Sequence, residues 1–135
     1  MSVESFDPGA ASVAVDEASV TRLLQASQLV GESDTHDFGL SQLERASMAG
    51  LMTAPAKEWH EAAQALSDDQ IESLVRFFTL AGEAISGWEA GAKSPVVPLV
   101  KVLKARGNYD PALTRWIKAN TSNRFLPRGS LMDRL

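Results

Sequence analysis

Apolar residues recur every three or four positions along most of this chain, which is the spacing that places them on one face of an α-helix. The clearest stripe follows Ser67 and consists of Ile71, Leu74, Val75, Phe78, Ala81 and Ile85. Ser67-Asp68-Asp69-Gln70 has the form of a capping box, in which the serine oxygen accepts a hydrogen bond from the backbone N–H of Gln70. This segment is therefore predicted to be the central core helix, ending near Gly87.

Proline and glycine divide the rest of the chain into further short helices. Ser94-Pro95 and Asp110-Pro111 each place a capping side chain before a proline, and Gly107 stands where a helix would end. No long stretch alternates apolar and polar residues, so no sheet is expected. The predicted helices span 16–30, 40–52, 54–66, 67–87, 94–106 and 111–119.

The expected fold is all-α: a single compact bundle of five or six short helices in residues 16–120. A chain of 135 residues can bury roughly two-thirds of its unfolded surface, which is enough for one core. Residues 1–15, rich in Ala, Ser and Val, are predicted to form a disordered N-terminal tail. Residues 121–135 carry apolar side chains without helical spacing, so we expect an extended C-terminal tail that packs on its own domain or on a partner.

The net charge of −4 hides a strong division of charge along the chain. Residues 1–90 hold four basic and fifteen acidic residues, a net charge of −11, whereas residues 91–135 hold nine basic and two acidic residues, a net charge of +7. Two interpretations follow. The two parts attract each other within one fold, or the C-terminal third offers a basic surface to an acidic partner.

The leading functional hypothesis is a non-enzymatic interaction or regulatory protein that contacts another protein, or a second copy of this chain, through its basic C-terminal third. Aromatic, aliphatic and arginine side chains are enriched in contact hot spots, and Trp88 between glycines is a candidate for an exposed anchor or a pocket wall. The predicted partner-binding residues are Trp88, Arg124, Phe125, Leu126 and Arg128. The competing interpretation makes the C-terminal residues a strap over their own bundle and Trp88 a lid over the core.

A nucleic-acid-binding protein is the alternative. The helices predicted at 94–106 and 111–119 are joined by a short turn, as in a helix-turn-helix. Against this, the chain is acidic overall, and its acidic N-terminal portion would repel phosphate. The residues predicted to contact nucleic acid are Lys101, Lys104, Arg106, Arg115, Lys118 and Arg124.

A small-ligand-binding protein or enzyme is the second alternative, without predicted catalytic residues, metal or cofactor. The chain has no cysteine, which excludes disulfides, thiolate nucleophiles and cysteine-ligated metals. His60-Glu61-Ala62-Ala63-Gln64 resembles the H-E-x-x-H zinc motif, but Gln64 replaces the second histidine. The sequence shows neither a secretory signal nor an apolar run of membrane-spanning length, so a cytoplasmic protein is expected.

Overall fold

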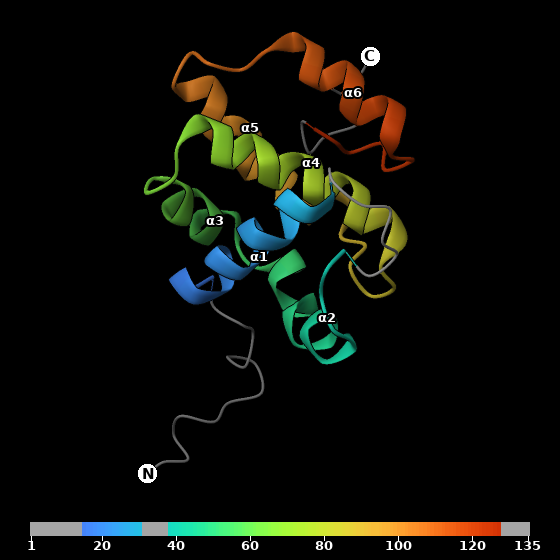
Figure 1. The fold of residues 1–135 in the computed structure, drawn as a ribbon. Helices are drawn as coiled ribbons and strands as arrows, with labels where there is room; N and C mark the ends of the chain where they lie inside the picture. Colours follow the sequence, from blue (N-terminus) through green and yellow to red (C-terminus); the bar gives the residue numbers. More distant parts are fainter. Residues whose placement is uncertain (1–14, 31–37, 128–135) are drawn as a thin grey trace.

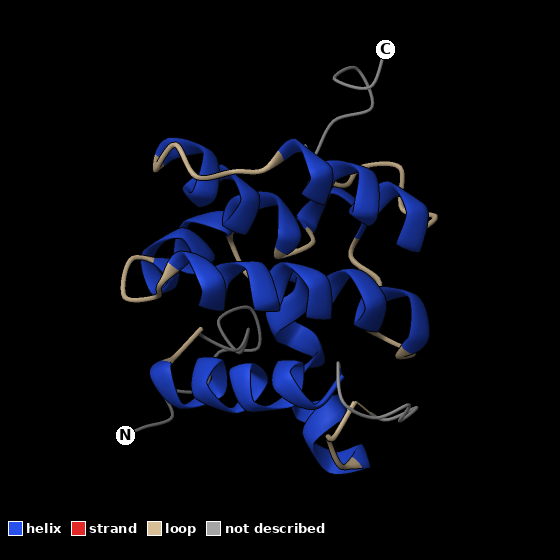
Figure 2. Ribbon diagram, turned by 45° about the horizontal axis from the view of Figure 1, so that its top comes forward, coloured by secondary structure: helices blue, strands red, loops and turns tan. Residues whose placement is uncertain are grey.

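Helices make up every regular element of the part of the chain that the structure, a computed structural model, describes: residues 15–30 and 38–127 (Figures 1 and 2). The predicted all-α bundle is confirmed, whereas the predicted N-terminal disorder concerns residues outside the described part, Val15 excepted. In chain order the elements are α1 (Glu17–Val30), α2 (Gln42–Met48), the 3₁₀ helix η2 (Ala49–Thr53), α3 (Ala56–Ala63), α4 (Asp68–Ala84), the 3₁₀ helix η3 (Gly91–Lys93), α5 (Val96–Ala105) and α6 (Pro111–Asn120).

Helix α4 crosses the middle of the molecule, with α1 on one side and α6 on the other (Figures 1 and 2). Its start is as predicted: the Gln70 N–H donates to Ser67 Oγ (3.1 Å), and the Ser67 N–H donates to Gln70 Oε1 (2.9 Å). The predicted stripe is buried, together with Phe77. Helix α4 also contacts α5, which in turn packs against α3.

Aromatic rings fill the centre of this bundle. The ring of Phe77 meets those of Phe38, Phe78 and Trp88 edge-on, with centroids 5.8, 5.5 and 6.1 Å away. Trp59 of α3 packs edge-on against Phe78 at 5.2 Å. Edge-to-face pairs of this kind add to the stabilisation that buried apolar area provides, so this cluster joins α3, α4 and the segment after α4.

Helix α2 departs from the prediction. One helix is predicted over 40–52, but α2 ends at Met48 and the chain continues as η2. A 3₁₀ helix has three residues per turn, so the change of helix type alters the register. Leu51 is buried, whereas Leu43 is 79% exposed and no residue of α2 is buried. The α2 start also has a capping box, Ser41 with Glu44, which the sequence reading overlooked.

Helices α5 and α6 begin and end close to their predicted bounds. Gly107 takes a positive φ of 76° after α5, where its N–H donates to the Lys104 carbonyl and the Asn108 N–H donates to the Leu103 carbonyl. These two hydrogen bonds end the helix and provide donors for the carbonyls of Lys104 and Leu103. At the start of α6, Asp110 Oδ1 accepts a hydrogen bond from the Ala112 N–H at 2.9 Å. Within the described part, no helix combines the length and apolar character needed to cross a bilayer.

Candidate functional site

Two lysines of α5 and two cations of α6 are exposed. Helix α5 is buried along most of its length, and Lys101 and Lys104 are exposed one turn apart. Helix α6 buries Leu113 and Ile117, while Arg115 and Lys118 are exposed on its outer side. The four cations, Lys101, Lys104, Arg115 and Lys118, are called the basic surface below.

Tyr109 connects the two halves of the basic surface. The Lys104 Nζ lies 5.1 Å from the centroid of the Tyr109 ring, within the range of a cation–π contact. The Tyr109 hydroxyl is hydrogen-bonded to Oγ1 of Thr114, which directly precedes Arg115 on α6. Tyr109 therefore links Lys104 of α5 to Thr114 of α6.

The division of charge along the sequence persists in the folded chain. None of the four cations of the basic surface forms an ion pair within the part of the chain that the structure describes. Arg106 does bridge the two parts, because its Nη1 lies 2.8 Å from Asp68 Oδ1. The acidic and basic parts of the chain thus attract each other through Arg106 and Asp68, while the cations of the basic surface are exposed to solvent.

Arg106, also predicted to contact nucleic acid, forms hydrogen bonds within the fold. Its guanidinium donates to the carbonyl of Ala63 (3.0 Å), the last residue of α3, and to the carbonyl of Leu66 (2.9 Å) in the turn before α4, in addition to its pair with Asp68. A cation at this position is favoured by the negative end of the helix dipole. Arg106 is therefore engaged inside the fold, unlike Lys101, Lys104, Arg115 and Lys118.

Of the two roles predicted for Trp88, exposed anchor and pocket wall, the exposed anchor is wrong. Trp88 is only 2% exposed and packs against Phe77. Its indole Nε1–H donates to the backbone carbonyl of Arg45 at 2.9 Å, so its polar edge also has a partner. This corresponds to the competing interpretation, in which Trp88 covers the core.

The C-terminal segment (residues 121–127) lies against its own domain. Leu126 is 3% exposed, and the Asn123 side-chain amide donates to the Gly91 carbonyl at 3.1 Å. The Leu126 side chain is thus part of the core in this chain and not an exposed contact. Phe125 is half-buried and Arg124 is exposed, whereas Arg128 lies outside the described residues.

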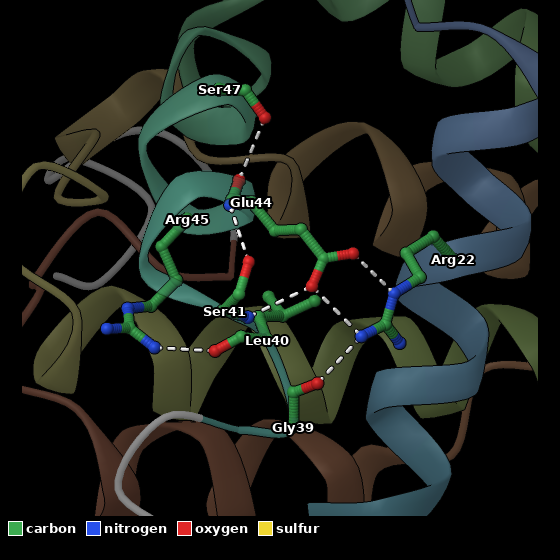
Figure 3. Close-up of polar contacts among 7 residues, drawn as sticks. All are labelled: Arg22, Gly39, Leu40, Ser41, Glu44, Arg45 and Ser47. Carbon is green, nitrogen blue, oxygen red and sulfur yellow. Dashed lines mark hydrogen bonds and ion pairs between the residues drawn. The ribbon is translucent and has the colours of Figure 1, made fainter.

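A polar network holds α2 against α1 and the loop between them (Figure 3). The Arg22 guanidinium lies 2.7 Å from Glu44 Oε2 and also donates to the Gly39 carbonyl at 2.7 Å. Hydrogen bonds from Arg22, and then from the Ser41 N–H, lower the pKa of Glu44 from 4.5 to about 2. The neighbouring Arg45 donates to the Leu40 carbonyl, so the network fixes the Arg45 backbone that receives Trp88.

Trp88 also lines a cavity of about 270 Å³ between the C-terminal half of α4, the segment that leads to α5, and the C-terminal segment. Apolar walls come from Met52, Phe78, Trp88 and Leu126. Thr79 and Ser94, 1% and 6% exposed, are the buried polar side chains of the described part, and both line this cavity. Glu83, Glu89 and Asn123 also belong to its lining, which contains no Lys, Arg or His.

Sequence reasoning missed these polar lining residues. The sequence predicts Ser94 only as a helix cap, and its Oγ does accept a hydrogen bond from the Val96 N–H at 3.2 Å. Thr79 lies between Phe78 and Leu80 in an apolar stretch, and this isolated hydroxyl was the one available signal. Nothing in the sequence shows that Glu83 and Ser122, 39 residues apart, are hydrogen-bonded.

The residues considered for a metal site do not come together. His60 and Gln64 are exposed on or just after α3, and the Gln64 side-chain amide donates to the His60 carbonyl at 3.2 Å. Within residues 15–30 and 38–127, no group of three His, Cys, Asp or Glu side chains is arranged to hold a metal ion.

Comparison with known proteins gives no relative from which a function could be transferred. The chain matches no protein-family model, no curated protein and no solved structure. The candidate sites therefore depend on the chemistry and geometry of this chain alone.

Proposed function

We propose that this chain is a non-enzymatic interaction module that binds an acidic protein through the basic surface, Lys101, Lys104, Arg115 and Lys118. The observation that carries the proposal is that these four exposed cations lack ion-pair partners within the described part of the chain. Cations that are not neutralised within a fold attract an oppositely charged surface and accelerate its association.

The composition of the exposed side of α6 favours a protein partner over nucleic acid. Beside Arg115 and Lys118 it presents Pro111, Ala112 and Ala119, which offer no side-chain groups for hydrogen bonds to base edges. The exposed Asn120 has such a group, but its side-chain amide already donates to the Trp116 carbonyl at 2.8 Å. Four cations also give few phosphate contacts for a chain of net charge −4. Alanines that flank the two cations suit the close approach of an acidic helix or loop.

Fluorescence anisotropy with a labelled amphipathic peptide, whose polar face carries only Glu and Asp, tests the proposal. Exposed charge pairs contribute up to about 1 kcal/mol each, so R115Q/K118Q should weaken peptide binding about fivefold. The matched control is K57Q/K93Q, which removes the same charge from exposed positions outside the basic surface. It should change the affinity less than about twofold.

A duplex DNA of the same net charge as the peptide provides the second arm of the experiment. Equal losses in the two variants would show that only net charge matters and would refute the proposed surface. Tighter binding of the duplex than of the peptide, at about 150 mM salt, would refute a protein partner in favour of nucleic acid.

A further inference from the structure

We propose that the cavity beneath the C-terminal segment binds a small molecule with an apolar body and a protonated amine. This proposal is independent of the basic surface. The two buried polar side chains of the described residues, Thr79 and Ser94, line the same cavity. Buried hydroxyls need hydrogen-bond partners, and their convergence on one hollow is typical of a ligand site.

The hydrogen bonds of these two hydroxyls leave capacity for a ligand. Thr79 Oγ1 donates to the Val75 carbonyl at 2.7 Å, so its oxygen can still accept a hydrogen bond. Ser94 Oγ accepts from the Val96 N–H, and among the described residues its hydroxyl proton has no acceptor. The cavity thus offers one acceptor and one donor, both buried.

The charges around the cavity determine whether a positively or a negatively charged ligand is favoured. Glu83 and Glu89 are exposed carboxylates in its lining, and neither forms an ion pair within the described part. Glu83 accepts hydrogen bonds from the N–H and the hydroxyl of Ser122, and Glu89 accepts one from the Gly87 N–H. With two carboxylates and no cation in the lining, an ammonium group is favoured and an anion is repelled.

The walls select the body of the ligand. Phe78, Trp88, Met52 and Leu126 line the cavity, and each is 2–3% exposed, so the lining is apolar and closely packed. A volume of about 270 Å³ accommodates a molecule the size of a single aromatic ring with a short chain. The geometry therefore points to a small aryl- or alkylamine, with its amine toward Glu83 and Glu89 and its body over Phe78 and Trp88.

Three probes with the same body and different charge test this directly: phenethylamine, phenethyl alcohol and phenylacetate, each titrated into the full chain near pH 7. Backbone amide shifts report where each probe binds. We expect phenethylamine to bind with a Kd of about 1 mM and to shift residues of the cavity, including Gly82, Gly91 and Asn123. The alcohol should bind at least about tenfold more weakly, and phenylacetate should cause no saturable shift.

Charge-neutral variants separate the cavity from general attraction to an acidic protein. The amide oxygen of Glu83→Gln or Glu89→Gln can still accept the observed hydrogen bonds, so each variant keeps its local contacts and loses one charge. Each should weaken phenethylamine binding at least about threefold, whereas Glu61→Gln, an exposed carboxylate of α3, should leave it unchanged. The proposal is overturned by equal binding of the three probes, by shifts that lie outside the cavity, by absence of amine binding at several times the expected Kd, or by an equal loss in Glu61→Gln.

Discussion

At the scale of single residues, Gly82 is a glycine that the fold does not require. It lies inside α4 without a positive φ, and the nearest atom that an added Cβ would meet is the Trp88 carbonyl oxygen at 3.9 Å, an ordinary contact distance. Glycine in a helix interior is less favourable than alanine. We expect Gly82→Ala to stabilise the protein by about 0.5–1 kcal/mol, measured by urea unfolding.

Gly87 is the matched control for this change. An added Cβ would meet nothing within 4 Å there, but φ is +91°, a conformation that side-chain-bearing residues rarely adopt. Gly87→Ala should therefore destabilise the protein by about 1 kcal/mol or more. If both substitutions changed stability in the same direction, the backbone geometry assigned to these two glycines would be contradicted.

Glu44 links stability to pH. Its pKa in the folded chain is lowered to about 2, chiefly by hydrogen bonds from Arg22. A carboxyl with a lowered folded pKa contributes stability that is fully present above its unfolded pKa, near 4.5, and is lost as pH falls toward 2. Wild type should therefore melt above Glu44→Gln at pH 7, and the difference in Tm should vanish between pH 4.5 and 2.

The double variant Arg22→Gln/Glu44→Gln checks that this ion pair is the cause. The pH-dependent part of its Tm difference from wild type should be no larger than that of Glu44→Gln alone, because both variants lack the same interaction. A difference in Tm that is constant from pH 7 to about 2 would contradict the assigned pKa.

At the scale of elements, the C-terminal segment is held by the burial of Leu126 in the core. Leu126→Ala should cost about 2–4 kcal/mol in the free energy of unfolding, as for other buried leucines. Leu43→Ala, at the 79% exposed position of α2, removes the same atoms and should change stability by less than about 0.5 kcal/mol. Equal effects of the two substitutions would show that the segment does not pack on its own domain.

Helices that begin or end with a local sequence motif can be predicted from the sequence. The Ser67 box, Gly107 and Asp110-Pro111 act through hydrogen bonds and backbone angles within a few residues, so their motifs place α4, α5 and α6 correctly. The change from α2 to η2 has no such motif, and the register of 40–52 was consequently wrong.

The candidate site was predictable only in part, for the same reason. Exposure of Arg115 and Lys118 follows from the helical spacing of α6, with Leu113 and Ile117 on the buried side. The burial of Trp88 depends on the Arg45 carbonyl, 43 residues earlier, and the glycines beside Trp88 suggested the opposite. The cavity gathers residues from α4, from the segment before α5 and from residues 121–126, a grouping that only tertiary structure creates.

At the scale of the whole molecule, acidic and basic residues are divided between two parts of the chain. The part up to residue 90 has a net charge of −11 and the remainder +7, and Arg106 with Asp68 is an ion pair that joins them. The four cations of the basic surface remain exposed. An acidic partner should therefore bind more weakly as salt rises, because exposed charges more than about 10 Å apart are screened at 0.1 M.

Mapping the acidic amphipathic peptide onto the full chain by backbone amide shifts shows whether an acidic partner binds at the basic surface. We predict saturable shifts concentrated between residues 101 and 118, around the exposed cations of α5 and α6, with α1 and α3 unaffected. Shifts that scatter over the molecule, that centre on the acidic helices, or that persist undiminished in R115Q/K118Q would contradict it.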